Sequence, residues 1–390
     1  MPPLEAPGAM ASIRALYVHI PFCHSICPFC AFAVHRHRPD LRRGYLEHLA
    51  LEAERAATIH GANAAVESVY IGGGTPSTLT AEEVRALVRG LAGRFAIARD
   101  AEVALEVNPE DATRDYLARL ADAGVNRVSL GLQSLDAATL RALGRAHSHA
   151  QSRAALAAAG EAGLANVNVD LMSGAPGISG EAFRRDVEEI ATRRPAHVSL
   201  YGLDIEERTL FGRSAPVRAW AEEHREEQAD LYLWAHERLT AAGYRHYEVS
   251  NFCLPGREGR QNLIVWRGGG YLGLGTGAHS CVAGERWHNA RHIAPYQREL
   301  AAGRPPVAFR ERLTPAQQAN ESLMLALRQD DGLDIPAWER GHRIVWDAAR
   351  ANVARLLAQG GQARYDGARL RLTPRGFLLA DAITEQLMVA

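Results

Sequence analysis

Three cysteines fall within a short segment, Cys23-His24-Ser25-Ile26-Cys27-Pro28-Phe29-Cys30, directly after the apolar run at 15–20. Three residues separate the first two cysteines and two separate the last two, so a loop can turn all three sulfurs toward one metal centre. A [4Fe-4S] cube has four irons to ligate, and three cysteines leave one iron for a group that the protein does not supply. The segment therefore indicates a cluster site with one open iron.

Two other uses of these cysteines are weaker. A tetrahedral zinc site takes a fourth ligand at finger-like spacing, and nearby histidines offer one: His19, His24, His35 and His37. A disulfide framework does not suit five cysteines, three of them this close together, in a chain with no stretch typical of a secretory signal. The spacing favours an iron-sulfur cluster and leaves zinc open.

Size and composition set the broad class of protein. The 390 residues are 47% hydrophobic, which is ordinary for a globular chain of one large and one smaller domain. The net charge is -1, and no apolar run approaches the roughly 20 residues that span a bilayer. We therefore expect a cytoplasmic protein with no transmembrane segment and no nucleic-acid partner. Residues 1–13 are expected to form a disordered lead.

Strand-like and helix-like stretches alternate over the first two thirds of the chain. Apolar, β-branched runs predict strands at 15–20, 66–71, 102–107, 126–132, 166–171 and 197–203. Helical patterns lie between them at 44–60, 81–91, 114–123, 137–143 with 150–162, and 181–192, and a longer helix follows at 222–242. The alternation predicts an α/β fold with a parallel sheet, a partial (βα)6 barrel. A doubly wound open sheet is the alternative.

Unusual residues follow or close these strands. The cysteine loop follows the first strand and Gly72-Gly73-Gly74 follows the second, while Glu106, Gln133 and Asp170 close the next three. The carboxyl ends of barrel strands meet at one mouth, where such folds place their chemistry. We therefore expect these residues to surround one site.

The cysteine loop and its flank, Tyr17-Val18-His19-Ile20-Pro21-Phe22-Cys23-x3-Cys27-x-Phe29-Cys30, resemble the cluster loop of radical S-adenosylmethionine (SAM) proteins. The nearest resemblance is to the oxygen-independent coproporphyrinogen III oxidase-like family, which contains the oxidase and a branch of haem chaperones. It covers residues 14–388. The resemblance implies a radical SAM barrel, a [4Fe-4S] cluster on Cys23, Cys27 and Cys30, and SAM on the open iron.

The resemblance also implies a set of SAM-binding residues. They are Tyr17 near the adenine, Gly73, Gly74 and Thr75 near the amino group, Glu106 in the same site, and Gln133, Arg145 and Asp170 near the ribose and carboxylate. Each alone is also explained as a turn glycine, a capping amide, a surface arginine or a strand-end carboxylate. Their shared placement after successive strands favours binding. Radical chemistry would further require a low-potential electron donor.

Two differences favour the haem-chaperone branch. The oxidases carry a fourth cysteine two residues after the third, where this chain has Phe32, and an N-terminal extension for a second SAM, where 16 residues precede Tyr17. We therefore expect a monomeric or homodimeric carrier that binds haem and delivers it to acceptor apoproteins, without coproporphyrinogen III oxidase activity. A radical SAM oxidoreductase acting on coproporphyrinogen III or a related substrate is the alternative, and a zinc-stabilised barrel is the third.

The expected haem site departs from the family pattern. The family's haem chaperones carry His-Asn-x-x-Tyr-Trp where this chain has Gln261-Asn262-Leu263-Ile264-Val265-Trp266. Haem iron takes an axial His, Cys, Met or Tyr, which neither Gln261 nor Val265 supplies, so haem binding through this motif should be weak. The candidate haem residues are Asn262, Trp266 and His279, and other ligands nearby are His246, Cys253, Cys281 and His288.

The remaining chain predicts two further regions beyond a radical SAM core at 14–245. Residues 246–312 should extend the barrel edge, with short strands or turns at 247–252, 261–266 and 270–280. From about Pro315, two helical stretches and the segment 367–376 predict a small helical and winged domain over 313–390. The wing carries no basic stripe, so it does not indicate nucleic acid.

Overall fold

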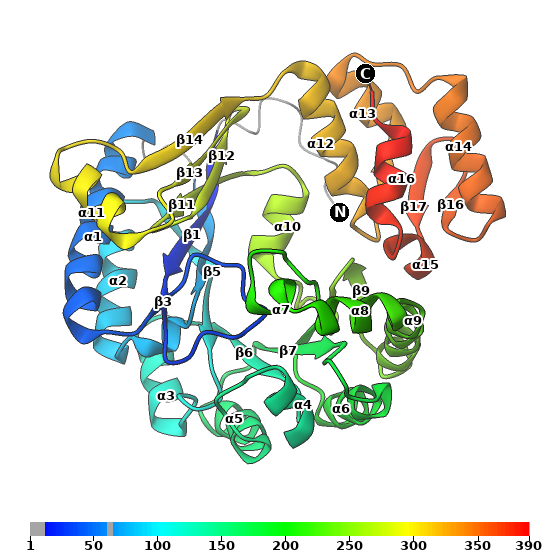
Figure 1. Ribbon diagram of the computed structural model, residues 1–390. Coiled ribbons are helices and arrows are strands. Elements are labelled where there is room, and N and C mark those ends of the chain that lie inside the picture. The colour runs from blue at the N-terminus through cyan, green and yellow to red at the C-terminus, as the bar shows by residue number, and fades with distance from the viewer. Residues whose placement is uncertain (1–11, 61–64, 390) are drawn as a thin grey trace.

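The structure is a computed structural model that describes residues 12–60 and 65–389. A wide, curved sheet carries helices on its outer face, and a second group of helices stands beside one end of it (Figure 1). The predicted lead at 1–13 lies outside the described residues except for its last two, and strand β1 (Ile13–Ile20) begins within it. No helix in the described part is long and apolar enough to cross a membrane.

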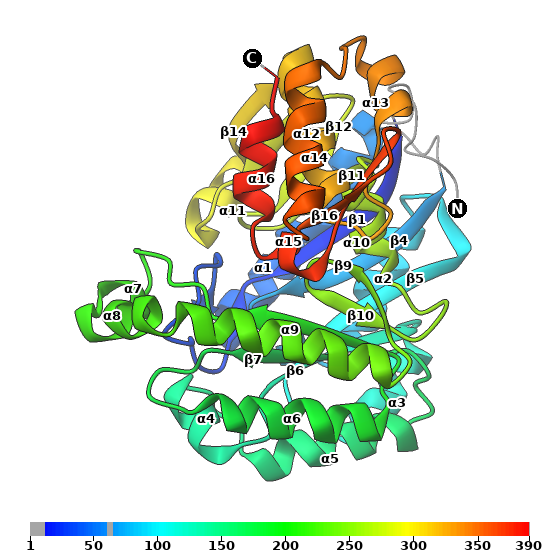
Figure 2. The ribbon, with the colours of Figure 1, turned by 90° about the vertical axis from the view of Figure 1, so that its right-hand side faces the viewer.

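The alternating pattern is confirmed at the centre of the sheet. Successive parallel pairs join β1 to β4 (Val66–Gly73), β5 (Ile97–Val107), β6 (Arg127–Gln133), β7 (Val167–Ser173) and β8 (His197–Gly202). The connecting helices are α1 (Pro39–His60), α2 (Ala81–Ala92), α3 (Arg114–Asp122), α4 (Ala137–Ala142), α5 (His149–Glu161) and α6 (Gly180–Arg193). Figures 1 and 2 show this as a partial barrel with an outer helical layer.

The segment expected at the barrel edge adds strands to both edges of the sheet. The strand order of the sheet, over the described residues, is β14-β13-β12-β11-β1-β4-β5-β6-β7-β8-β10-β9. One edge gains β11 (Gly270–Leu274), which is parallel to β1, and then antiparallel β12 (His279–Val282), β13 (Glu285–Asn289) and β14 (Val307–Arg312). The other edge gains antiparallel β10 (Asn251–Cys253) and β9 (Arg245–Glu248).

Three elements differ from the sequence-based prediction. Residues 261–266, expected as a strand or turn, belong to helix α10 (Arg260–Trp266), whose Gln261 and Ile264 are both buried and one turn apart. The single helix expected at 222–242 is interrupted at His224, whose backbone (φ -102°, ψ 13°) leaves the helical conformation between α8 (Ala215–Glu223) and α9 (Arg225–Ala241). Asp170 does not close its strand, because β7 continues to Ser173.

The C-terminal helices enclose their own apolar core. The indole of buried Trp338 donates to the Ala319 carbonyl at 3.1 Å. The elements are α12 (Pro315–Leu327), α13 (Ile335–His342), α14 (Ala348–Gln359), α15 (Pro374–Phe377) and α16 (Ala380–Leu387), with a sheet of β15 (Leu333–Asp334), β17 (Arg369–Leu372) and β16 (Ala363–Tyr365). This region contains more helices than the two expected. The domain boundaries after 245 and 312 stay predictions.

Buried Glu52 of α1 connects the core to the strands added beyond β1. Its carboxylate accepts hydrogen bonds from Asn289 Nδ2 and the Tyr296 hydroxyl, both at 2.6 Å, and from the Gly275 N–H at 2.7 Å. Tyr296 lies on α11 (Ile293–Ala301). Burial raises the pKa of Glu52 to about 7, against the opposite effect of these hydrogen bonds. The position of β13 and α11 therefore depends on one buried carboxyl group.

We expect this group to make stability fall as pH rises from 4.5 toward about 7. Folded Glu52 keeps its proton to higher pH than unfolded Glu52, so the folded state binds more protons in this window and loses stability through it. The contribution is at most about 3 kcal/mol. Glu52→Gln should lose about 1–3 kcal/mol near pH 5 by removing an acceptor, but should depend less on pH. Urea unfolding of both proteins across this range tests this, and parallel pH profiles would contradict it.

Candidate functional site

The cysteine loop leaves the end of β1 and lies across the mouth of the barrel. Cys23 ends the short strand β2 (Phe22–Cys23) and is buried, while Cys27 and Cys30 are half-buried; all three are free thiols. β2 pairs with β3 (His35–Arg36), which closes the base of the loop. Burial raises the pKa of the Cys23 thiol to about 11 and also raises the pKa of Cys30. A bound metal would replace these protons.

One cavity of about 440 Å³ brings most of the predicted site together. Its lining includes Cys23, Cys27, Cys30, Gly73, Gly74, Thr75, Glu106, Gln133, Arg145 and Asp170. These residues come from the loop after β1, the end of β4, strands β5 to β7 and the segment after α4. The volume is in the range of small-molecule and cofactor sites.

Four predicted residues lie outside this lining. The Tyr17 hydroxyl is 3.0 Å from His19 Nδ1, and its ring stacks on Tyr70. Asn262 and Trp266 lie on α10, and Asn262 lines a separate polar cavity of about 60 Å³. His279 is exposed at the start of β12. Asn262 and Trp266 therefore lie outside the lining of the cavity with the cysteines, although the two cavities adjoin at Ser129 and Tyr201.

Glu106 is fixed against β4. Its Oε1 accepts from the Tyr70 hydroxyl at 2.8 Å, and its Oε2 accepts from the Gly73 N–H at 3.0 Å. A Cβ on Gly72 would come within 2.9 Å of the carboxylate, so this close approach requires glycine. Burial, together with the nearby Asp170 carboxylate, raises the pKa of Glu106 to about 7. A cationic ligand in the cavity would favour the ionised carboxylate.

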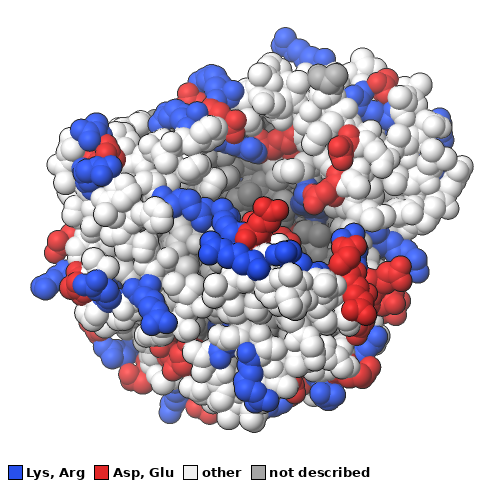
Figure 3. Space-filling view, viewed as in Figure 1, with Lys and Arg blue, Asp and Glu red and all other residues white. Residues whose placement is uncertain are grey.

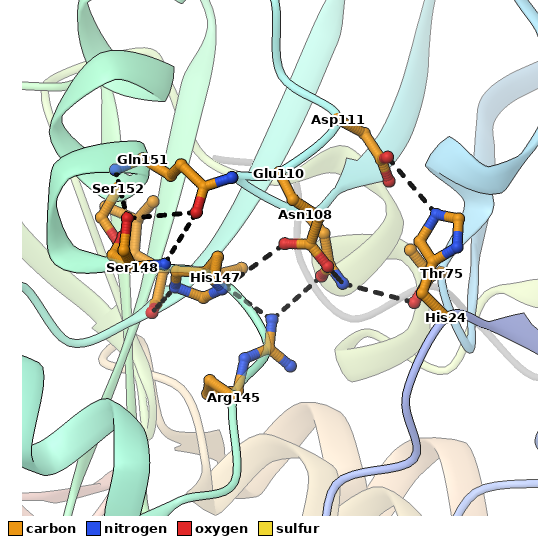
Figure 4. Close-up of polar contacts among 12 residues, drawn as sticks. His24, Thr75, Asn108, Glu110, Asp111, Arg145, His147, Ser148, Gln151 and Ser152 are labelled. Atoms are coloured by element: carbon orange, nitrogen blue, oxygen red, sulfur yellow. Dashed lines mark hydrogen bonds and ion pairs between the residues drawn. The ribbon is translucent and has the colours of Figure 1, made fainter.

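Arg145 reaches from the segment after α4 toward the cysteine loop. Its Nη1 is 3.2 Å from Cys27 Sγ, and its Nη2 donates to the Gly131 carbonyl at 3.0 Å. The same Nη2 donates to Asn108 Oδ1 at 3.0 Å (Figure 4). Arg145 Nε and Gln133 Oε1 are buried without a hydrogen-bond partner. Gln133 also has φ 63°, in the left-handed region. Unpaired buried groups and backbone strain in one cavity indicate a site shaped for a polar ligand.

Three further lining residues were not predicted. Asn108 bonds Arg145, and its Nδ2 is 3.5 Å from Thr75 Oγ1, while Ser129 donates to Asp170 at 3.1 Å. Tyr201 lies near the end of β8. Sequence offered a signal for two of them: Asn108 follows Glu106 at the end of the third strand, and Tyr201 belongs to the one strand left without a polar end residue.

Histidines and carboxylates lie close together around the cavity, so its surroundings do not create a field of one sign. His24 Nε2 is 3.4 Å from Asp111 Oδ1, and His147 Nδ1 is 3.5 Å from Glu110 Oε2 (Figure 4). Figure 3 shows arginines and carboxylates side by side around the hollow of this face. The site therefore has local charge-pairing groups but no strong overall attraction for a large polyanion.

The arrangement of the thiols suits a cluster better than a single ion. Over residues 12–60 and 65–389, no group of three or more His, Cys, Asp and Glu side chains is close enough to hold one metal ion. A single ion draws its ligands to one point, whereas a cube takes one thiolate at each of its separate irons. Of the histidines considered for zinc, His19 is buried with Nε2 bonded to the Ala33 carbonyl at 3.0 Å.

Comparison with known proteins agrees with the fold. Residues 17–190 match the radical SAM superfamily, and residues 313–379 match the HemN C-terminal domain. The solved structure of coproporphyrinogen III oxidase (HemN) from Escherichia coli superposes with a TM-score of 0.83 at 23% identity, covering 99% of this chain and 92% of that chain. Fold and site together define a radical SAM protein, a class that uses a [4Fe-4S] cluster and SAM.

More closely related sequences narrow this class. The haem chaperone HemW of Mycobacterium tuberculosis is 37% identical over 394 residues, 99% of this chain and 98% of the relative. The bovine protein named radical S-adenosyl methionine domain-containing protein 1, mitochondrial, is 33% identical over 398 residues, 99% of this chain and 89% of the relative. The chain belongs to the HemW family.

We expect Gly74→Ala to disturb the cysteine loop. A Cβ there would lie 2.8 Å from Cys23 Sγ and 2.9 Å from the Pro21 carbonyl, so the loop must shift, at a cost of roughly 1–3 kcal/mol. Iron and sulfide content after anaerobic reconstitution, with thermal unfolding, should both fall. Gly160→Ala in α5 is the matched control, since its Cβ meets nothing within 4 Å. A Gly74→Ala protein with unchanged cluster content and stability would show that the close approach is unimportant.

Proposed function

We propose that this protein is a radical SAM haem chaperone, which holds a [4Fe-4S] cluster and SAM at the barrel mouth, binds haem and passes it to acceptor apoproteins. One observation carries the proposal: a single cavity is lined by the three cysteines and by most of the predicted SAM residues. The haem role is inferred from the names of relatives that match nearly the whole chain. The cluster and SAM, when bound, would supply the superfamily's electron-transfer and C–S cleavage chemistry.

Cys23, Cys27 and Cys30 are the proposed cluster ligands. Three thiolates occupy three irons and leave the fourth for SAM. Arg145 Nη1, 3.2 Å from Cys27 Sγ, supports the thiolate there by charge-assisted hydrogen bonding. Cys253 and Cys281 are buried elsewhere and take no part.

Arg145 and Gln133 are the proposed partners of the polar end of SAM, because each carries a buried atom without a partner. Glu106 and Asp170 accept hydrogen bonds from the ligand's ammonium and hydroxyl groups, and the Gly73–Gly74–Thr75 backbone forms the adjoining wall. Tyr17 contributes through contact with His19 and Tyr70 instead of the cavity wall.

The partners follow from this role. Haem-accepting apoproteins receive the cargo, and a low-potential donor reduces the cluster when radical chemistry is required. A monomer and a homodimer both suit the proposal. Five free cysteines fit a reducing cytoplasm.

The test is anaerobic reconstitution of the full chain followed by two parallel assays. We expect stoichiometric haem binding with transfer to an apo-haemoprotein, and no turnover of coproporphyrinogen III. Absence of haem binding by the reconstituted protein would overturn the chaperone function, and turnover of the porphyrinogen would replace it with an oxidoreductase.

We expect Cys23→Ala, Cys27→Ala and Cys30→Ala each to abolish the EPR signal of the reduced cluster, since each removes one of three iron ligands. Cys253→Ala and Cys281→Ala should keep the signal, which makes them matched controls. Four irons and an unchanged signal in Cys27→Ala would refute the ligand assignment.

Arg145→Ala should weaken SAM binding by about 30- to 1000-fold, equivalent to about 2–4 kcal/mol for a buried charge-assisted contact. Calorimetry with the reconstituted protein measures this. The control is Arg185→Ala, whose side chain is 67% exposed on α6. Equal SAM affinity in wild type and Arg145→Ala would show that the guanidinium does not contact the ligand.

A further inference from the structure

A haem carrier needs an axial ligand for the iron. The side chains proposed for that role differ in whether a porphyrin can reach them. Gln261 is buried beside a polar cavity of about 60 Å³, which has no room for a porphyrin. His246 is buried with its ring stacked on Phe252 at 4.0 Å, and Cys253 is buried. Cys281 is buried too, whereas His279 is exposed and His288 is half-exposed.

His279, His288 and Phe309 form a row of rings on one face of the β12–β14 strands. His279 pairs directly with His288 across β12 and β13, with ring centroids 5.0 Å apart. Phe309 of β14 pairs with His288, stacks on it at 5.7 Å and is 51% exposed. Neighbouring Trp287 faces the other side of the sheet, against His60. This aromatic row is therefore open to solvent.

The hydrogen bond of His288 decides which of its ring nitrogens is free to ligate a metal. Its Nδ1 lies 3.1 Å from the carbonyl oxygen of Asn289. A carbonyl only accepts, so Nδ1 carries the proton and the Nε2 lone pair is available. Metal-ligating histidines commonly have such a partner, which fixes the ring and raises its basicity.

The surroundings favour a metalloporphyrin over a bare cation. A bare ion needs several protein ligands, and no group of three or more suitable side chains is found in the described part of the chain. A porphyrin brings four nitrogens of its own, so one imidazole is sufficient. The exposed face of Phe309 adds apolar contact for the macrocycle.

The connections that flank the aromatic row contact the cysteine loop. Arg291, in the connection after β13, donates from Nη2 to the Ala31 carbonyl at 2.8 Å. A Cβ on Gly277, two residues before His279, would come within 2.8 Å of Ala33 Cβ. Between these two contacts the loop carries Phe32, which is 71% exposed. The exposed ring of Phe32 thus lies on a segment that contacts the connections flanking β12 and β13.

We propose that His288 is the axial ligand of haem iron, with His279 and Phe309 beside it, in place of the histidine absent at position 261. This inference rests on the haem-carrier function proposed above. A ligand on an exposed strand suits a carrier, because an acceptor can approach the iron without the carrier unfolding.

The test is titration of the full chain with hemin, followed by the Soret band. Wild type should give a histidine-ligated spectrum, and His288→Gln should bind at least about 10-fold more weakly with a shifted band. His149→Gln, at an exposed histidine that begins α5, is the matched control and should match wild type. Iron-free protoporphyrin IX should bind wild type and His288→Gln equally, because stacking on Phe309 is kept.

A second variant separates ligand loss from misfolding. Methionine also ligates haem iron, so His288→Met should retain haem with a different spectrum. An unchanged spectrum and affinity in a His279→Ala, His288→Gln double variant would overturn this site while leaving the carrier function standing. Absence of hemin binding by wild type would overturn both.

Discussion

The rest of the site depends on how closely the cysteine loop packs against two other segments, the end of β4 and the turn after α4. The Gly74 N–H donates to the Ile20 carbonyl at 2.8 Å, so the end of β4 is tied to the start of the loop. A Cβ at Gly144 would lie 2.6 Å from the ring of Pro28, in the middle of the loop. This position therefore requires glycine, as position 74 does. These two contacts fix the height of the loop above the barrel, and Arg145, next to Gly144, is thereby brought to Cys27.

A chain of hydrogen-bonded side chains runs through the barrel interior, away from the mouth. Asn168 donates to Asp170 Oδ1 at 2.8 Å, and its own Oδ1 is 2.6 Å from His197 Nδ1. His197 Nε2 is 2.8 Å from the Tyr247 hydroxyl, which accepts from the Gly259 N–H at 3.1 Å. Burial lowers the pKa of His197, so the ring is neutral and donates at one nitrogen while accepting at the other. A continuous run of side chains thus links the cavity to the turn before α10, and each member limits the rotation of the next.

Sequence patterns predicted the parts of the fold whose causes are local. Alternation of apolar runs and helical faces predicted the six central strands. The carboxyl ends of these strands meet at one mouth, and Glu106 and Gln133 line the same cavity as the cysteines. The helix that starts at Arg260 was missed because its beginning is set by a distant contact, a hydrogen bond from its N–H to Glu102 Oε1 at 3.0 Å. The order of strands at both sheet edges likewise depends on pairings between residues far apart in the chain, which no short window records.

The two outer strands of the sheet differ in how they are protected from further pairing. β9 is covered from within the chain. The N–H of Asp330 donates to the Tyr247 carbonyl at 3.1 Å, and the N–H of Val249, directly after β9, donates to the Arg328 carbonyl at 2.9 Å. β14 has no such cover among the described residues and instead carries Arg310 and Arg312, both paired with Glu285 of β13. An identical strand laid against β14 would bring arginines together at close range, so aggregation by sheet extension is opposed at the one edge where the backbone is open.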